Sequence, residues 1–325
     1  MADKASKRAI LVTGATGKQG SATIDALIAS GALDTHTLVA VTRNPASGTA
    51  QKLASRGVQL VQGDLNDVPA IFANVKKQLG GGDNAKVWGV FSVQTAIGGG
   101  ASPESEERQG KALVDAALAN GVAHFVYTSA DRGGEARSFS NPTQVPHFVS
   151  KYNIEHHLVE QAATAAAASS NGRPAMTWTI LRPVAFMENF TVGFGTKIMA
   201  TGMRVSLNGK PLQLVSARDI GWFAAQAFIR PEAYAGRSVT LAGDELTLSD
   251  LRAVFQQKTG HDMPETFQFV ARILFWLSAE FGSMFRWFHD EGFGADFSAL
   301  RKEHAGLQSW GDWLENESDW VVKSK

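Results

Sequence analysis

The chain has 325 residues, a formal net charge of +0 and 44% hydrophobic residues, values typical of a globular protein with one large or two moderate domains. This neutral balance argues against nucleic acid or an anionic membrane as a partner, because both attract strongly basic surfaces. The count of 0 cysteines excludes disulfides, thiolate nucleophiles and cysteine-bound metals. The polar start MADKASKR is unlike a signal peptide, and the apolar run at 269–277 is too short to span a bilayer. We therefore expect a soluble, cytoplasmic protein.

Short apolar runs rich in β-branched residues alternate with helix-like stretches through the first half of the chain. Because these runs are continuously apolar rather than strictly alternating, they are typical of parallel strands buried on both faces. The predicted strands are residues 9–13, 37–42, 58–64, 87–93, 124–130 and 177–183.

Helices are predicted between the strands, at 21–30, at 107–121 and from 151 to an end at Asn171 and Gly172. Repeated β-α-β alternation predicts an α/β fold, a Rossmann-type doubly wound parallel sheet with right-handed crossovers. After Pro183 the pattern loosens and aromatic residues cluster. We expect a Rossmann domain at 7–183 and a smaller C-terminal substrate-binding or partner-binding region at 184–325.

The segment GATGKQG lies between the first predicted strand and the first predicted helix. In this place the first glycine allows a tight turn, the second lets the backbone approach a pyrophosphate, and the third lets helix and strand pack closely. The helix N-terminus offers N–H groups to the phosphates. A glycine turn without a ligand is the alternative. The residues predicted to bind a dinucleotide here are Gly14, Ala15, Thr16, Gly17, Lys18, Gln19 and Gly20.

The end of the second strand bears on the choice of cofactor. An NAD-specific site needs an acidic residue there for the ribose 2′-hydroxyl, but this sequence reads TLVAVTRNP, with Arg43 in that place. A guanidinium pairs well with a 2′-phosphate, so NADP(H) is predicted. A solvated surface arginine is the alternative. Asp64, at the end of the third strand, is placed to reach the adenine edge, although aspartate also forms turns.

Several segments together resemble the NmrA-like family, atypical members of the short-chain dehydrogenase/reductase superfamily. They are GATGKQG, VTRNP, VQGDLND, ERQGKALVDAALANGVAHFVYTSA, LRPVAFMENF and MFRWFHDEGFGADFSALRKEHAGLQSWGDWL. The resemblance implies a Rossmann domain that binds NADP(H) and a small C-terminal domain, in a family of reductases and redox-sensing regulators. By the match, the cofactor would also meet Leu65 beside Asp64, Val93, Gln94 and Thr95 after the fourth strand, and, at the nicotinamide end, Phe186, Met187, Glu188 and Asn189.

Ordinary members of the superfamily use a Tyr-x-x-x-Lys pair and a serine on the fifth strand. Here the segment VPHFVSKYN places Lys151 at the lysine position and His147 where the tyrosine would stand, while Ser129 fits the serine. Helix positions four apart share a face, and histidine is a competent general acid. However, the Lys151 charge disfavours a protonated neighbour, and His147 can equally be a packing residue. Lys151 is expected to bind the ribose.

Two functions follow from these residues. The first is an NADPH-dependent reductase that transfers hydride to a small hydrophobic carbonyl, imine or enone, with His147 and Lys151 as candidate catalytic residues. The second is a non-catalytic NADP(H) sensor that binds a protein partner, favoured by the missing tyrosine. We lean to the enzyme, and we expect no metal, no nucleic acid and no membrane partner. The substrate is not specified by the sequence.

Overall fold

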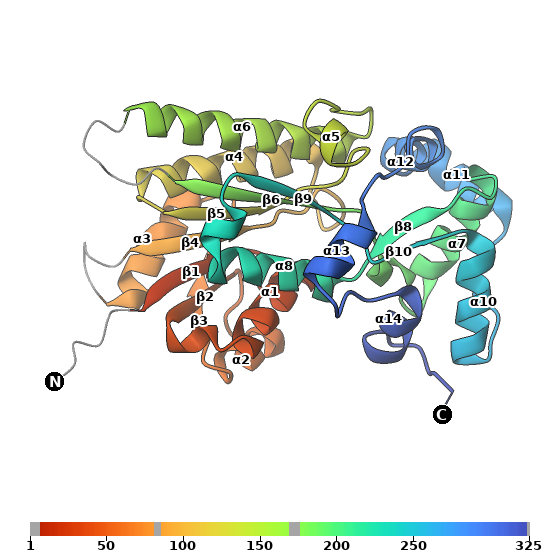
Figure 1. The fold of residues 1–325 in the computed structure, drawn as a ribbon, viewed down its shortest axis with the longest axis horizontal. Helices are drawn as coiled ribbons and strands as arrows, with labels where there is room; N and C mark the ends of the chain where they lie inside the picture. The colour runs from red at the N-terminus through yellow and green to blue at the C-terminus, as the bar shows by residue number, and fades with distance from the viewer. Residues whose placement is uncertain (1–6, 81–85, 169–175, 324–325) are drawn as a thin grey trace. The chain divides into compact units, whose positions relative to one another are not determined.

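A computed structural model describes residues 7–80, 86–168 and 176–323 (Figure 1). Its main sheet has the strand order β3-β2-β1-β4-β5-β6-β9. Each neighbouring pair from β3 to β6 is parallel. The strands are β1 (Arg8–Val12), β2 (His36–Thr42), β3 (Gln59–Gln62), β4 (Val87–Ser92), β5 (His124–Thr128), β6 (Thr177–Pro183) and β9 (Arg237–Leu241).

Helices follow the strands and cover both faces of this sheet. Apolar side chains of α3, α4 and α6 share one buried core with the strands. On the other side, α8 places Phe228 against Gly89 of β4, and its Gly221 touches Ala22 of α1. Figure 1 shows α4 and α6 on the opposite side of the sheet from α1 and α8. The helices are α1 (Lys18–Ala29), α2 (Gly48–Ala54), α3 (Val68–Leu79), α4 (Pro103–Ala119), α6 (Pro146–Ala168) and α8 (Ala217–Ile229).

The predicted fold class is confirmed, and all six predicted strands are present with ends shifted by at most a few residues. Three helices begin earlier than predicted, and the first of them, α1, begins at Lys18 rather than at residue 21. Helix α4 begins at Pro103, where the Ser102 hydroxyl accepts from the Ser105 N–H in a capping box, and α6 begins at Pro146. A proline is favourable at the start of a helix because its missing N–H is not needed there. The predicted helix end at Asn171 and Gly172 lies outside the described residues.

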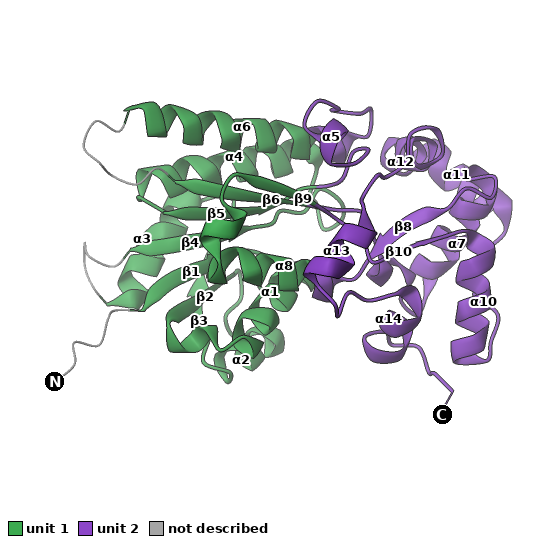
Figure 2. Cartoon of the chain, in the orientation of Figure 1, with its two compact units in different colours: residues 1–129, 150–181, 220–239 green, residues 130–149, 182–219, 240–325 purple. Residues whose placement is uncertain are grey.

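The chain forms two compact units (Figure 2). The first unit comprises residues 1–129, 150–181 and 220–239, and the second comprises 130–149, 182–219 and 240–325. The chain therefore passes between the units several times. The division of the sequence at Pro183 remains a proposal about domain boundaries.

The second unit has a small sheet of its own, with the order β10-β8-β7. Strand β8 (Leu212–Val215) is antiparallel to β10 (Asp244–Leu246) and parallel to β7 (Ala185–Phe186). Its core is rich in buried aromatic side chains, including Phe285, Trp310 and Trp313. Its helices are α5 (Glu135–Ser138), α7 (Phe194–Ser206), α10 (Leu248–Thr259), α11 (Gln268–Leu277), α12 (Ala279–Asp290), α13 (Phe297–Glu303) and α14 (Trp310–Asn316).

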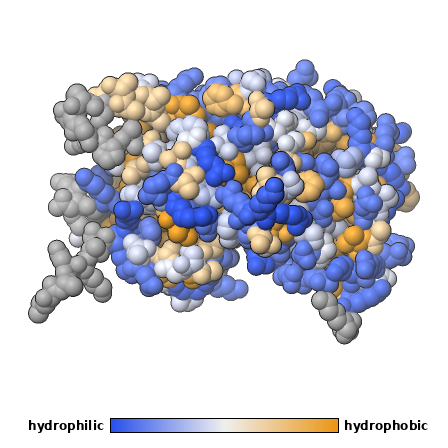
Figure 3. All heavy atoms as spheres, viewed as in Figure 1, coloured by the Kyte–Doolittle hydropathy of each residue, from blue (hydrophilic) through white to orange (hydrophobic). Residues whose placement is uncertain are grey.

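The surface is mixed in character. On the face shown in Figure 3, hydrophilic residues cover most of the surface and hydrophobic residues form small patches between them. Helix α11 is the main exception, because Phe269, Ile273 and Trp276 are all exposed. None of the helices in the described part of the chain has both the length and the apolar character needed to cross a bilayer.

Candidate cofactor site

The loop between β1 and α1 turns tightly at its first glycine. Gly14 has a left-handed φ of 56°, and a Cβ there would lie 2.6 Å from Val93 Cγ1. The Gly17 N–H donates to the Gly14 carbonyl at 2.9 Å, and α1 begins one residue later. Gly17 is the N-cap of α1 and supplies no side-chain acceptor to its first turn. This end of the helix therefore presents N–H groups in the way that suits an anion.

The second and third glycines of the loop have different surroundings. A Cβ on Gly20 would lie 2.2 Å from the Gly14 carbonyl oxygen, so α1 and the loop touch backbone to backbone. A Cβ on Gly17 would meet only that same oxygen, at 3.3 Å. Gly20 is thus required by packing within the protein, whereas the space beside Gly17 is open.

A cavity of about 710 Å³ lies at the carboxyl ends of β1 to β4, all within the first unit. In doubly wound sheets this edge is where ligands bind. The cavity is lined by Thr13, Gly14 and Thr16 after β1, residues 41–44 and 47 at the end of β2 and after it, residues 63–66 after β3, residues 93–95 and 97–101 after β4, and Ser105, Arg108 and Gln109 of α4.

Many of the predicted cofactor-binding residues line this one cavity. They are Gly14, Thr16, Arg43, Asp64, Leu65, Val93, Gln94 and Thr95. Ala15 is a fully buried residue of the loop, and the Gln19 amide oxygen accepts from the Thr128 hydroxyl at 2.5 Å. Gly17, Lys18 and Gly20 belong to the same turn and the start of α1 without lining the cavity.

Arg43 brings positive charge to the end of β2. Its side chain is exposed and lines the cavity. The next residue is fixed by a hydrogen bond from the Asn44 N–H to the Thr42 hydroxyl at 3.2 Å. No acidic residue among those lining the cavity follows β2, since the acidic lining residue, Asp64, follows β3. The end of β2 therefore suits a ligand with a 2′-phosphate, which pairs with a guanidinium, better than a ligand with a free ribose 2′-hydroxyl, which needs a carboxylate acceptor.

The loop after β4 is anchored to β1. Thr13 accepts from the Val93 N–H at 3.0 Å and donates to the Phe91 carbonyl at 3.0 Å. Gln94 is buried, and its amide donates to the Ser92 hydroxyl at 2.9 Å. These bonds fix the backbone where it passes the first glycine of the loop.

Among the lining residues that were not predicted from the sequence, three are joined by hydrogen bonds: Asn66, Arg108 and Gln109. Asn66 accepts through Oδ1 from Arg108 Nη2 at 3.2 Å and from Gln109 Nε2 at 3.1 Å. These two hydrogen bonds connect the loop after β3 to residues of α4 that lie 42 and 43 positions further along the chain. The sequence marked these residues only indirectly, because they lie in two of the segments that resemble the family, VQGDLND and ERQGKALVDAALANGVAHFVYTSA.

Lys151 is held by a carboxylate that was not predicted from the sequence. Its Nζ donates to Glu106 Oε1 at 2.8 Å, and the Ser150 hydroxyl donates to the other oxygen of the same carboxylate. Glu106 is fully buried in the first unit. Lys151 does not line the cavity. Ser129 is also buried, with its N–H on the Leu181 carbonyl at 2.7 Å.

His147 belongs to the second unit and contacts Glu280 of α12. The His147 N–H donates to Glu280 Oε1 at 3.1 Å, and Nδ1 of the imidazole contacts the same oxygen. The neighbouring Phe148 packs edge-on against Trp287, with ring centroids 5.1 Å apart. Glu280 therefore both caps the start of α6 and orients the imidazole.

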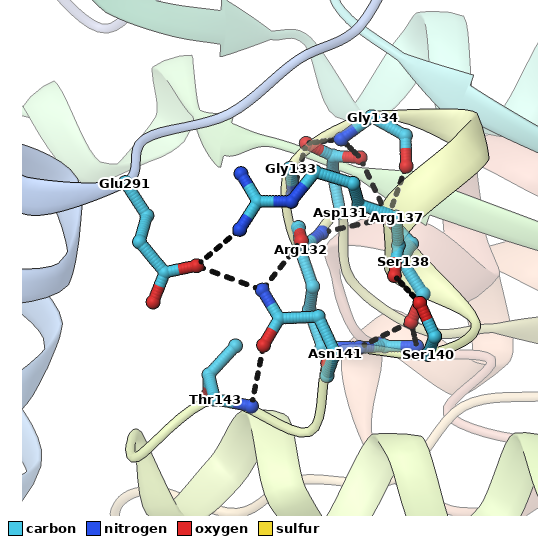
Figure 4. A network of polar contacts seen from close by, with 10 residues as sticks. All are labelled: Asp131, Arg132, Gly133, Gly134, Arg137, Ser138, Ser140, Asn141, Thr143 and Glu291. Atoms are coloured by element: carbon cyan, nitrogen blue, oxygen red, sulfur yellow. Dashed lines mark hydrogen bonds and ion pairs between the residues drawn. The ribbon is translucent and has the colours of Figure 1, made fainter.

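The loop that leads to His147 is held by a network of polar contacts, which Figure 4 shows. Arg132 is fully buried and donates from Nη2 to the Ser138 carbonyl at 2.7 Å. The Asp131 carboxylate accepts from the Gly294 N–H at 2.8 Å. Buried polar groups with several partners confer rigidity. The loop is thus a defined structure within the second unit.

The segment predicted at the nicotinamide end also lies in the second unit. Phe186 ends β7, and Met187 is fully buried in the 3-10 helix that follows (Met187–Phe190). Glu188 accepts through Oε1 from the Ala217 N–H at 2.8 Å and from Trp313 Nε1 at 3.1 Å, whereas Asn189 is exposed. Within the described residues, no group of three His, Cys, Asp or Glu side chains is arranged to hold a metal ion.

A parallel sheet with a glycine turn after β1 and a cavity at the carboxyl ends of its strands defines a Rossmann-type fold. Residues 6–310 match the model of the NmrA-like family, and the chain belongs to that family. The NmrA-like family domain-containing oxidoreductase hkm9 of Aspergillus hancockii is 26% identical over 273 residues, covering 79% of this chain and 74% of that protein. The NAD(P)H azoreductase of Xenophilus azovorans is 28% identical over 223 residues, covering 68% of this chain and 64% of that protein.

Solved structures share the fold. The triphenylmethane reductase of Citrobacter sp., crystallised with NADP(H), has a TM-score of 0.65 and 18% identity, covering 94% of this chain and 99% of that one. NmrA, a negative transcriptional regulator, has a TM-score of 0.67 and 18% identity, covering 96% of each chain. NmrA has also been crystallised with NADP. The predicted family and fold are thereby confirmed, and this fold is found in both reductases and a regulator.

Proposed function

We propose that this protein binds NADP(H) in the cavity of the first unit and is an NADPH-dependent reductase of a small hydrophobic carbonyl, imine or enone. The observation that carries the proposal is the cavity itself, which combines a turn too tight for side chains at Gly14 with an arginine after β2. When bound, the cofactor supplies a hydride. The 2′-phosphate is assigned to Arg43 and the pyrophosphate to the Gly14–Gly20 turn.

Further residues are assigned roles in this proposal. Lys151 would bind the ribose, and residues 186–189 would border the nicotinamide. His147, oriented by Glu280, would deliver the proton that accompanies reduction. The azoreductase and triphenylmethane reductase relatives support an aromatic or otherwise apolar substrate.

A non-catalytic NADP(H) sensor that binds a protein partner is a second candidate. One observation favours it: the residue in the tyrosine position, His147, is held by Glu280 through its N–H and its imidazole, as a structural residue would be. The likeness to NmrA, a transcriptional regulator crystallised with NADP, points the same way.

Binding and turnover measured on the same preparation distinguish these functions. NADPH affinity is measured by titration calorimetry, and NADPH oxidation is followed with aromatic ketones, quinones and imines. Tight binding with steady turnover of any compound supports the reductase, and tight binding with no turnover supports the sensor. A wild-type protein that does not bind NADPH contradicts both.

A further inference from the structure

One wall of the cavity in the first unit is polar, and the proposed function assigns no role to the three residues that form it. Arg108 and Gln109 of α4 and Asn66 of the loop after β3 all line the cavity. The Asn66 amide oxygen accepts from Arg108 Nη2 and Gln109 Nε2, at 3.2 Å and 3.1 Å. Two donors use both lone pairs of that oxygen. The guanidinium of Arg108 is therefore held at the cavity wall.

Asn66 is itself held in place by the turn after β3. Its N–H donates to Asp64 Oδ1 at 2.8 Å, and the Asp67 N–H donates to the Asp64 carbonyl at 2.9 Å. Hydrogen bonds thus run without a break from Asp64 through Asn66 to Arg108. At one end of this wall lies the Asp64 carboxylate, which accepts hydrogen bonds, and at the other end lies the planar, cationic guanidinium of Arg108.

This combination fits a purine base better than it fits a phosphate. A guanidinium stacks on flat nitrogen heterocycles, and a carboxylate accepts from an exocyclic amine. A phosphate at this wall would face the charge of Asp64, whereas Arg43 offers a phosphate partner on a different element, after β2. The two arginines of the cavity therefore differ in what they can recognise.

We propose that Arg108, positioned by Asn66 together with Gln109, binds the adenine ring of the nucleotide by stacking, and so contributes to affinity for any adenosine-containing ligand. This inference rests on the proposed function for the identity of the ligand. It predicts a role for Arg108 that does not depend on the 2′-phosphate.

The test compares four ligands by titration calorimetry: NADPH, NADH, adenosine 5′-monophosphate, and reduced nicotinamide mononucleotide, which has no adenine. The variants are Arg108→Ala and Arg108→Lys, which keeps the charge but loses the plane. The control is Arg56→Ala, an exposed arginine of the same unit that pairs with Asp25 and does not line the cavity.

We expect Arg108→Ala to weaken the binding of NADPH, NADH and adenosine monophosphate by a similar factor of about 10. The affinity for reduced nicotinamide mononucleotide should not change. Lysine should not restore affinity. Loss confined to NADPH and rescued by lysine would assign Arg108 to the 2′-phosphate and overturn the inference, as would wild-type affinities in Arg108→Ala. Adenosine monophosphate keeps the two proposals separable. If wild-type protein binds it in an Arg108-dependent way but does not bind NADPH, the proposed function fails and this inference stands.

Discussion

Lys151 Nζ lies 2.8 Å from Glu106 Oε1, and the Glu106 side chain is 1% exposed. The residue expected to meet the ribose is thus paired with a carboxylate buried in the same unit. Breaking a buried ion pair by removing one partner leaves the other charge without compensation. Glu106 is therefore expected to contribute both to the stability of the fold and to the position of the Lys151 ammonium group.

Glu106→Ala is expected to lower the free energy of unfolding by about 3 kcal/mol or more, measured by urea denaturation. Glu106→Gln should cause a smaller loss, because its amide oxygen can still accept from Ser150. The matched control is Glu107→Ala. Glu107 pairs with Lys111 at 2.6 Å, but its side chain is 30% exposed, so a loss within about 1 kcal/mol is expected. Equal losses at 106 and 107 would show that burial of the pair has no energetic weight.

Arg43 is expected to determine the choice between NADPH and NADH. Arg43→Asp replaces a charge-assisted hydrogen bond with repulsion, so NADPH binding should weaken by about 2 kcal/mol or more. NADH binding should hold or improve, since the new carboxylate can accept from the ribose hydroxyl. Both dissociation constants are measured by calorimetry, with Arg56→Asp as the control for a charge change elsewhere. A wild-type protein with equal affinity for both cofactors would rule out this role.

The two later glycines of the loop should respond differently to a side chain. Gly20→Ala is expected to destabilise the fold by about 1–3 kcal/mol, because its Cβ would overlap the Gly14 carbonyl, 2.2 Å away. Gly17→Val should leave the fold intact and abolish NADPH binding, because its side chain would fill space next to the helix N-terminus. Circular dichroism, thermal melting and calorimetry measure these effects, with Gly48→Ala, which would meet nothing within 4 Å, as control. Normal NADPH binding by Gly17→Val would remove the turn from the cofactor site.

The sequence was sufficient to predict the first six strands because each is a continuous apolar run between turn residues. The second unit was not predictable in the same way, since its strands β7, β8 and β10 have only 2, 4 and 3 residues. Periodicity cannot be read from segments that short. Its compactness comes instead from aromatic packing between helices distant in the chain.

Part of the candidate site was predictable for a related reason. The glycine turn, Arg43 and Asp64 follow strands directly, so their position at one edge of the sheet follows from the alternation of elements. The carboxylates that hold Lys151 and His147 lie 45 and 133 residues away from them in the sequence. Only the packing of α4 and α12 brings these carboxylates to their partners, and no local pattern marks them.

Acid should destabilise the first unit through His124. Burial lowers the pKa of His124 from 6.5 to about 4, partly opposed by the charge of Glu232. A histidine with a lowered pKa binds fewer protons when folded than when unfolded. Its contribution to stability is therefore complete above pH 6.5 and is lost as the pH falls towards 4. Burial lowers the pKa of His36 as well, and this acts in the same direction.

The measurement is the free energy of unfolding of wild type and His124→Gln at several pH values between 7.5 and 4. Wild type should lose about 3 kcal/mol more than the variant over this interval. The comparison uses the change in the free energy of unfolding with pH, because a loss of stability from weaker packing in the variant is the same at every pH and cancels. Parallel pH profiles would contradict the assignment.

His147 is the residue that separates the reductase from the sensor. If it donates the proton, His147→Ala should reduce kcat by about 100-fold or more and leave the NADPH Kd unchanged. His147→Tyr should recover part of the rate. Lys151→Ala should impair both NADPH binding and turnover, because the ammonium is assigned to the ribose.

A purely structural His147 leads to the opposite pattern. The His147→Ala variant would then melt at a lower temperature, since Glu280 loses one of its partners, and would keep a near-normal kcat. Glu280→Gln is the informative companion, because its amide oxygen can still accept from the His147 N–H. A fully active His147→Ala would leave solvent or a substrate group as the acid.

The path of the chain through the two units limits how this protein can be divided or recombined. A fragment ending at Pro183 would lack α8, and with it Phe228, which packs on Gly89, and Gly221, which touches Ala22. Such a fragment would expose apolar surface on β4 and be prone to aggregate. Exchange of the C-terminal half with that of a relative would likewise replace a helix of the first unit. Diversification of the second unit is therefore expected through substitutions and loop insertions within its segments rather than through transfer of a terminal domain.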